Sequence, residues 1–151
     1  MGIKDIFVRN IIIKLGTSNC KIFSSDGFYL QTKSKVVYQI HGVRKPIPFL
    51  LEESFHMMGV WEHSLFIDGV PSLPEIAFMV RLLLARARIK KRFLRYFQKE
   101  KIILLLPYSC CRQAIEQIVA VLKAENISSY LVMTELEFIT KNQTIPARRK
   151  L

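Results

Sequence analysis

The sequence lacks a long uninterrupted hydrophobic run and has few acidic residues, cysteines and histidines. Its 151 residues include 23 Lys or Arg against only 12 Asp or Glu, and the formal net charge is +11. No apolar stretch approaches the roughly 20 residues of a membrane-spanning helix, so we do not expect one. The opening residues, MGIKDIFVRNIII, are interrupted by charges, which is typical of neither a signal peptide nor a span.

The small number of cysteines indicates the compartment and argues against a metal site. Cys20, Cys110 and Cys111 are odd in number, and because adjacent cysteines rarely bridge each other, we expect a reduced, cytoplasmic protein. None of the three histidines has the spacing of a metal site, and no second cysteine pair is present, so no zinc is expected. Buried, inert cysteines are preferred over the alternative, a nucleophilic thiol paired with a distant histidine.

The length and the hydrophobic content predict one folded domain. Half of the residues are hydrophobic, which excludes global disorder and is sufficient for a core. There is no internal repeat and no low-complexity linker. We therefore expect a single domain over 1–140, followed by a polar, basic tail over 141–151.

The positive charge is concentrated in one segment and in the tail. Residues 81–101 contain nine Lys or Arg and one acid, and Arg148, Arg149 and Lys150 add three further positive charges, which together equal the whole excess. Such clustering indicates an acidic partner: an anionic membrane surface, an acidic protein or nucleic acid. The candidate contact residues are Arg81, Arg88, Lys90, Lys91, Arg92 and Arg95. The alternative is a solvated helix face; nucleic acid is the least favoured partner, although the aromatic residues of 88–101 could stack on bases.

Hydrophobic periodicity and turn residues predict strands first and then alternating helices and strands. The expected strands are Val8–Ile13, Cys20–Phe23, Phe28–Gln31, Lys35–Ile40, Lys101–Leu106 and Ser129–Met133. The expected helices are Leu50–Met58, Pro74–Phe97 and Cys111–Ala124. Hairpin or turn signals stand at Asp26-Gly27 and at Asp68-Gly69-Val70-Pro71. The fold class is therefore α/β, with a β-meander followed by β-α-β-α-β elements and helices packed on a mixed sheet.

The turn KLGTSN, between the first two expected strands, has the composition of a phosphate-binding loop. Gly16 allows close approach of the backbone, and Thr17, Ser18 and Asn19 offer hydroxyl, amide and main-chain donors. A magnesium–nucleotide site of this kind needs an acid where the first strand ends, and this chain has Lys14 there.

Three stretches resemble the MreB family of bacterial actin-like proteins. IIIKLGTSNCKIFSSDGFYL resembles the opening strand, the first phosphate loop and the hairpin beyond it. EESFHMMG and IDGVPSLPEIAFMVRLLL resemble the segments that lead into the long first-domain helix. ILLLPYSCCRQAIEQIVAVLKAENISSYLVMTELEFIT resembles the strand–loop–helix–strand unit that ends in Glu-Glu-Pro. The resemblance covers about residues 5–140 and implies a ribonuclease-H-like half of an actin-like ATPase; the Hsp70 chaperones share that fold and are a weaker match.

The chain departs from the pattern of that family where the chemistry would take place. The family's magnesium-organising Asp is replaced by Lys14, and the Glu-Glu-Pro element reads Thr134-Glu135-Leu136, with Glu135 retained and the proline lost. The second phosphate loop does not follow. Because phosphoryl transfer needs phosphate, metal and water positioned together, we expect no enzyme activity. We expect no cofactor, the alternative being weak binding of ATP with magnesium through Lys14, the loop over 16–19 and Glu135.

These observations predict a non-catalytic, degenerate actin-like protein that acts as a binding or scaffold partner in bacterial cell shape or the cytoskeleton. The expected partner is a full-length actin-like filament protein or a second copy, and an anionic inner-membrane surface is a further candidate. The amphipathic opening segment Met1–Ile13 and the basic residues would support weak, peripheral membrane contact. The alternatives are an ATP-binding module whose site is completed by another chain, a basic nucleic-acid-binding protein, and a truncated product with no retained role.

Overall fold

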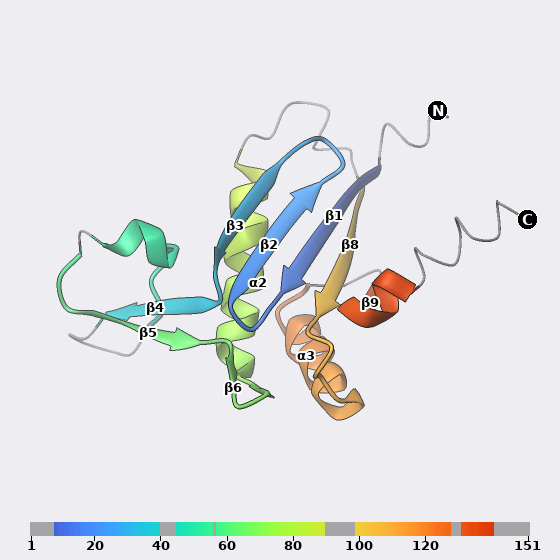
Figure 1. Ribbon diagram of the computed structural model, residues 1–151. Coiled ribbons are helices and arrows are strands. Elements are labelled where there is room, and N and C mark those ends of the chain that lie inside the picture. Colours follow the sequence, from blue (N-terminus) through green and yellow to red (C-terminus); the bar gives the residue numbers. More distant parts are fainter. Residues whose placement is uncertain (1–7, 40–44, 56, 90–98, 128–130, 141–151) are drawn as a thin grey trace, which may run out of the picture.

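A five-stranded mixed sheet forms the centre of the computed structural model, which describes residues 8–39, 45–55, 57–89, 99–127 and 131–140 (Figure 1). The strand order is β3-β2-β1-β8-β9. The strands are β1 (Val8–Leu15), β2 (Asn19–Ser24), β3 (Tyr29–Lys33), β8 (Lys99–Leu106) and β9 (Leu131–Thr134). β1, β2 and β3 form an antiparallel meander, whereas β8 and β9 run parallel to β1. The predicted α/β fold class, with a meander followed by crossovers, is confirmed.

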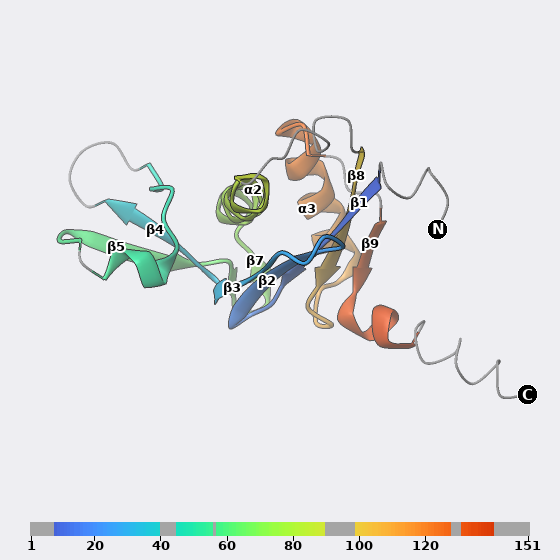
Figure 2. The same cartoon turned by 90° about the horizontal axis from the view of Figure 1, so that it is seen from above.

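Both long helices lie on the same face of this sheet (Figure 2). Helix α2 (Leu73–Arg88) precedes β8, and helix α3 (Arg112–Ala124) connects β8 to β9. The alternation of β1 turns its fully buried residues toward these helices, whose own buried residues recur at helical spacing. The resulting core includes Ile11, Ile13, Leu15, Cys20, Ile22, Ile76, Met79, Val80, Leu83, Leu104, Leu106, Ile118 and Leu122.

A second, smaller sheet is inserted between β3 and α2. Strand β4 (Lys35–Gln39) pairs antiparallel with β5 (Val60–Ser64), and the 3-10 turn η1 (Leu51–Ser54) lies between them in the chain. The short hairpin of β6 (Phe66–Ile67) and β7 (Val70–Pro71) then leads into α2. The strand predicted at Lys35–Ile40 therefore exists, but it lies outside the main sheet, and Ile40 is not among the described residues.

A buried polar cluster joins the small sheet to the start of α2. The hydroxyl of Tyr38 donates to Glu75 Oε1 at 2.7 Å, and the hydroxyl of Ser72 donates to Glu75 Oε2 at 2.5 Å. Although burial by itself raises the pKa of Glu75, these two hydrogen bonds lower it below its ordinary value. The ring of Tyr38 also stacks on Trp61, with centroids 4.8 Å apart. The cluster fixes the first turn of α2 against β4 and β5.

Three expectations about secondary structure need correction. The helix predicted at Leu50–Met58 is wrong, because only the four residues of η1 are helical there and a strand, β5, follows. The helix predicted to reach Phe97 is described to Arg88, and its remainder falls largely outside the described residues. A helical segment over 135–140, where no helix was predicted, begins with reciprocal contacts between Thr134 and Glu137. None of the helices in the described part of the chain is long and apolar enough to cross a bilayer.

Candidate functional site

The polar residues predicted to bind nucleotide lie at one edge of the main sheet. β1 and β9 belong to the parallel part of the sheet, and their carboxyl ends lie at the same edge (Figure 1). The turn between β1 and β2 begins at this edge, and so does the segment after β9. Ligands bind at this edge in open α/β sheets. Lys14 stands beside Leu105 of β8, and Leu105 stands beside Met133 of β9. This register places Lys14 and Glu135 at the same edge, although 120 residues separate them in sequence.

Lys14 and Glu135 form an ion pair across this edge. The Lys14 ammonium lies within direct contact distance of Glu135 Oε1, and the two side chains are 29% and 33% exposed. The Lys14 ammonium and the Glu135 carboxylate are therefore engaged with each other, and neither is presented to a ligand. Lys21 of β2 is the cross-strand neighbour of Lys14, so a second cation stands close to the position where a metal-organising acid would be needed. The charges at this edge do not fit a magnesium ion.

The turn after β1 is closed by its own backbone. The Gly16 N–H donates to the Asn19 carbonyl at 3.0 Å, and a Cβ at Gly16 would lie only 2.5 Å from that oxygen. The Ser34 hydroxyl donates to the Gly16 carbonyl at 2.6 Å and also contacts Cys20 Sγ at 3.2 Å. The glycine is therefore required by the turn itself. Thr17 and Ser18, by contrast, are exposed.

Two cavities lie away from the predicted phosphate loop. An opening of about 510 Å³ is lined by residues that include Arg81, Arg88 and Glu125, and one of about 610 Å³ lies between the β2–β3 turn and the end of α2. None of the residues predicted to bind nucleotide lines either cavity. The predicted site is thus an exposed edge at which only Lys14 and Glu135 are held against each other.

The described members of the predicted acidic-partner surface are already paired within the chain. Arg81 Nε lies 2.8 Å from Glu125 Oε2, and Arg88 Nε donates to Glu100 Oε1 at 2.9 Å. The other four, Lys90, Lys91, Arg92 and Arg95, lie outside the described residues. The positive charge available to an external partner is therefore smaller on α2 than the sequence alone indicates.

The thiols and carboxylates do not assemble into another reactive centre in the described part of the chain. Burial raises the pKa of the Cys20 thiol to about 11, and burial together with Cys111 raises that of Cys110. Cys111 caps α3, where its sulfur accepts from the Ala114 N–H at 3.4 Å. Among the described residues, no group of three or more His, Cys, Asp or Glu could hold a metal.

The capping contacts of Thr134 and Glu137 explain why a helix follows β9, and they were not predicted from the sequence. The Thr134 N–H donates to Glu137 Oε2 and the Glu137 N–H donates to Thr134 Oγ1, both at 3.3 Å. The signal was present in the sequence, since Thr-x-x-Glu is the pattern of a capping box. A helix therefore starts at this edge, in the place of the loop that the Glu-Glu-Pro pattern would form, and Glu135 lies in its first turn.

Comparison with known proteins identifies the fold. No protein-family model and no curated protein matches the sequence. Among solved structures, a non-polymerising mutant of MamK bound to AMPPNP is 18% identical, with a TM-score of 0.63 over 85% of this chain and 41% of its own. MreB5 of Spiroplasma citri bound to ADP is 16% identical, with a TM-score of 0.61 over 86% of this chain and 38% of its own. The chain spans about two fifths of the length of these proteins, and it shares its fold with that part of them.

Proposed function

We propose that the chain is a non-catalytic actin-like module, which acts by binding another protein in the bacterial cytoskeleton or cell-shape machinery. The ion pair between Lys14 and Glu135 is the observation that supports this proposal most strongly. Hydrolysis of a nucleotide requires a magnesium ion and an oriented water next to the phosphates. Here an ammonium group stands at the expected metal position, and its partner is the one acid that was expected to orient the water.

The fold supports a partner of the filament-forming kind. MamK, which shares the fold, has also been solved as a double helical filament, at 18% identity and a TM-score of 0.56. We therefore propose a full-length actin-like filament protein, or a second copy of this chain, as the partner. The expected location is the cytoplasm, with peripheral contact to the inner membrane.

A titration with magnesium and ATP tests the non-catalytic assignment. Isothermal titration calorimetry of the full chain should show no saturable heat, and phosphate release should stay at the level of a protein-free blank. Turnover above the blank would overturn the non-catalytic assignment, and saturable binding in the micromolar range would overturn the expectation that the chain alone binds no nucleotide. Co-sedimentation with preformed filaments of a full-length actin-like protein tests the proposed partner, with bovine serum albumin as the control for trapping.

A residual ATP-binding module completed by another chain is the second candidate. It is favoured by the nucleotides in the solved relatives, AMPPNP in MamK and ADP in MreB5. In that case calorimetry of the chain alone should show no saturable heat. When the filament protein is added, saturable binding should appear, with more nucleotide bound than the filament protein's own sites account for. The exposed hydroxyls of Thr17 and Ser18 would then contact the phosphates.

A further inference from the structure

The second face of the main sheet has no helix on it among the described residues. Helices α2 and α3 both pack on one side, and only the short helical segment over 135–140 borders the other side, at the β9 edge (Figure 2). All-parallel sheets have both faces covered, whereas antiparallel sheets commonly leave one face solvated; here β1, β8 and β9 form the parallel part of the sheet. The uncovered side faces the viewer in Figure 1.

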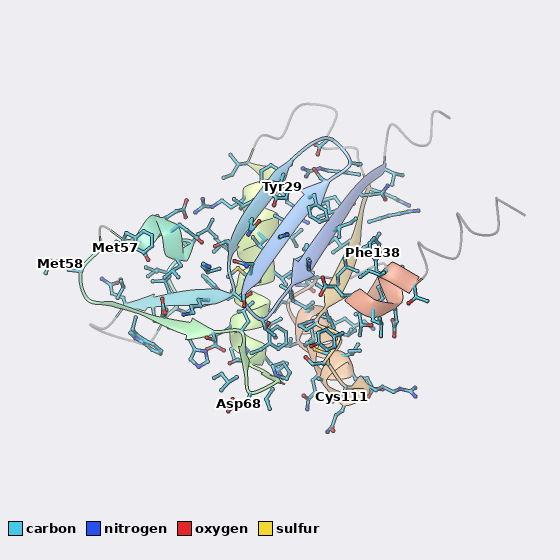
Figure 3. The ribbon with its side chains drawn as sticks, viewed as in Figure 1. Tyr29, Met57, Met58, Asp68, Cys111 and Phe138 are labelled. Atoms are coloured by element: carbon cyan, nitrogen blue, oxygen red, sulfur yellow. The ribbon has the colours of Figure 1, made fainter. Side chains whose placement is uncertain are left out.

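An apolar row crosses this second face from edge to edge. One residue of each strand contributes to it, and each is the direct register neighbour of the next. The row consists of Tyr29, Phe23, Ile12, Ile103 and Leu131, and we call it the apolar row. Leu105 and Met133 follow on the same face toward the carboxyl ends of β8 and β9, but both are buried. Tyr29, labelled in Figure 3, is 58% exposed. Its ring stacks on that of Phe23, with the ring planes 2° apart.

The remaining members of the apolar row are half-buried, unlike the residues that point at the helices. Ile12, Phe23, Ile103 and Leu131 are each of intermediate exposure, whereas their neighbours on the helix-covered side, such as Ile11 and Ile13, are completely buried. These four side chains are therefore partly accessible on the second face. An apolar sheet face is normally buried against a helix or a second sheet, so a helix suits this surface.

The charges around the apolar row are positive. Lys21 and Lys33 are on the same face of the sheet as Phe23 and Tyr29, at one end of the strands. Lys99 and Lys101 of β8 are on this face at the other end. No acid among the described residues pairs with the Lys21 or Lys33 ammonium. Of the two acids in the segment over 135–140, Glu135 is paired with Lys14, and Glu137 accepts from the Thr134 N–H. Electrostatic complementarity therefore requires an acidic occupant.

Charge also disfavours a second copy and the two basic segments of this chain as occupants. A second copy would bring the same lysines to a face-to-face contact, on a chain of net charge +11. The basic segments 90–98 and 141–151 would likewise bring positive charge toward positive charge.

We infer that the apolar row and its flanking lysines form the docking surface for an acidic amphipathic helix of a partner protein. The leucine-type side chains of that helix cover Phe23, Ile12 and Ile103, and its carboxylates reach the lysines at the two ends of the face. This inference rests on the binding role proposed above and gives that role a surface and a partner chemistry.

A designed peptide tests the surface without knowledge of the natural partner. The probe is a fluorescein-labelled helix of about 18 residues, with leucines on one face and glutamates on the other; a matched peptide carries lysines in place of the glutamates. Fluorescence anisotropy with the full chain, at low salt and without nucleotide, should show saturable binding of the glutamate peptide only. Binding should weaken about tenfold in Ile103→Gln, because the substitution removes apolar area from the contact.

Matched variants separate this surface from general charge attraction. Lys21→Glu should weaken binding of the glutamate peptide several-fold. Lys123 is an exposed lysine of α3 on the covered side, so the Lys123→Glu variant should bind this peptide as the wild type does. Circular dichroism should confirm that each variant is folded.

Three outcomes would overturn the inference: equal binding of both peptides, no effect of Ile103→Gln, or no binding at all. Because nucleotide is absent throughout, phosphate release above the blank in the ATP experiment would overturn the non-catalytic assignment and leave this result unaffected.

Discussion

The ammonium group of Lys14, near the end of β1, is ion-paired with the carboxylate of Glu135, the first residue after β9. The pair spans the edge of the sheet at which the resemblance to the MreB family predicts magnesium and the attacking water. Two residues that would have to act separately on a ligand thus neutralise each other. An ammonium group paired with this acid does not fit a magnesium site.

Restoring the acid alone should not restore chemistry. In Lys14→Asp the expected rate of phosphate release from magnesium–ATP remains at the blank, because one carboxylate supplies neither the second phosphate clamp nor the water-orienting group in the correct place. A coupled phosphate-release assay at saturating ATP measures this, with the wild-type chain and heat-denatured protein as references. Turnover above the blank in the variant would show that the described edge retains more of the active site than its charges indicate.

The ion pair itself should contribute little to stability. Because both side chains are about one third exposed, a double-mutant cycle with Lys14→Ala and Glu135→Ala should give a coupling of about 0.2–1 kcal/mol. The coupling should shrink as salt is raised from 50 mM to about 0.5 M, since exposed pairs are screened. Urea unfolding measures each term. A coupling well above that range would indicate that the pair is more desolvated than the structure shows.

The sequence predicted most of the main sheet but not the pairing at its edge. Alternation over β1 and β2, the Asp26-Gly27 turn and the apolar run of β8 are local signals, and each produced the expected element. The contact between Lys14 and Glu135 depends on the parallel register of β1, β8 and β9, which no local pattern encodes. Both residues could therefore be proposed as site residues from the resemblance, but not as partners of each other.

The errors in secondary structure have local physical causes. The segment after Leu50 has an acidic first turn and apolar residues, yet only η1 forms, and Glu53 is used to cap its start and to bind Arg86. The residues of β5, VWEHS, lack a clean alternation because every one is partly or fully exposed on its own small sheet. A two-stranded sheet stabilised by its contact with α2 gives a weak signal in the sequence.

The Tyr38–Glu75 hydrogen bond should make stability depend on pH. The pKa of Glu75 is lowered in the folded chain, so its contribution is complete above the ordinary value of 4.5 and is lost as the pH falls through the folded value. Tyr38→Phe should therefore cost about 1–3 kcal/mol at pH 6 and clearly less at pH 3. Urea unfolding at both pH values measures the difference. Tyr108→Phe, at an exposed tyrosine, is the control and should change nothing; an equal cost of Tyr38→Phe at both pH values would contradict the prediction.

Lipid binding should depend on basic residues that lie outside the described part of the chain. We expect weak, salt-sensitive co-sedimentation with anionic vesicles and none with neutral ones, each Lys or Arg near the surface contributing about 1 kcal/mol. Replacing Lys90, Lys91 and Arg92 with Gln should abolish it. Arg81→Gln, which removes a charge already compensated by Glu125, should have little effect. Equal binding to neutral vesicles would exclude the electrostatic explanation.

Arg9 should be the most destabilising arginine to remove. Its side chain is 2% exposed and donates to the Ala87 carbonyl at 3.0 Å; Nε lies 3.2 Å from Asp26, an ion-pair contact rather than a directed hydrogen bond. Arg9→Ala would leave Asp26 and Glu100 without this partner and the end of α2 without its cap, at a cost of about 3–5 kcal/mol. Arg112→Ala, at an arginine that is 94% exposed, should cost less than about 0.5 kcal/mol. Similar urea midpoints for the two variants would show that the buried cation stabilises the fold no more than a surface one.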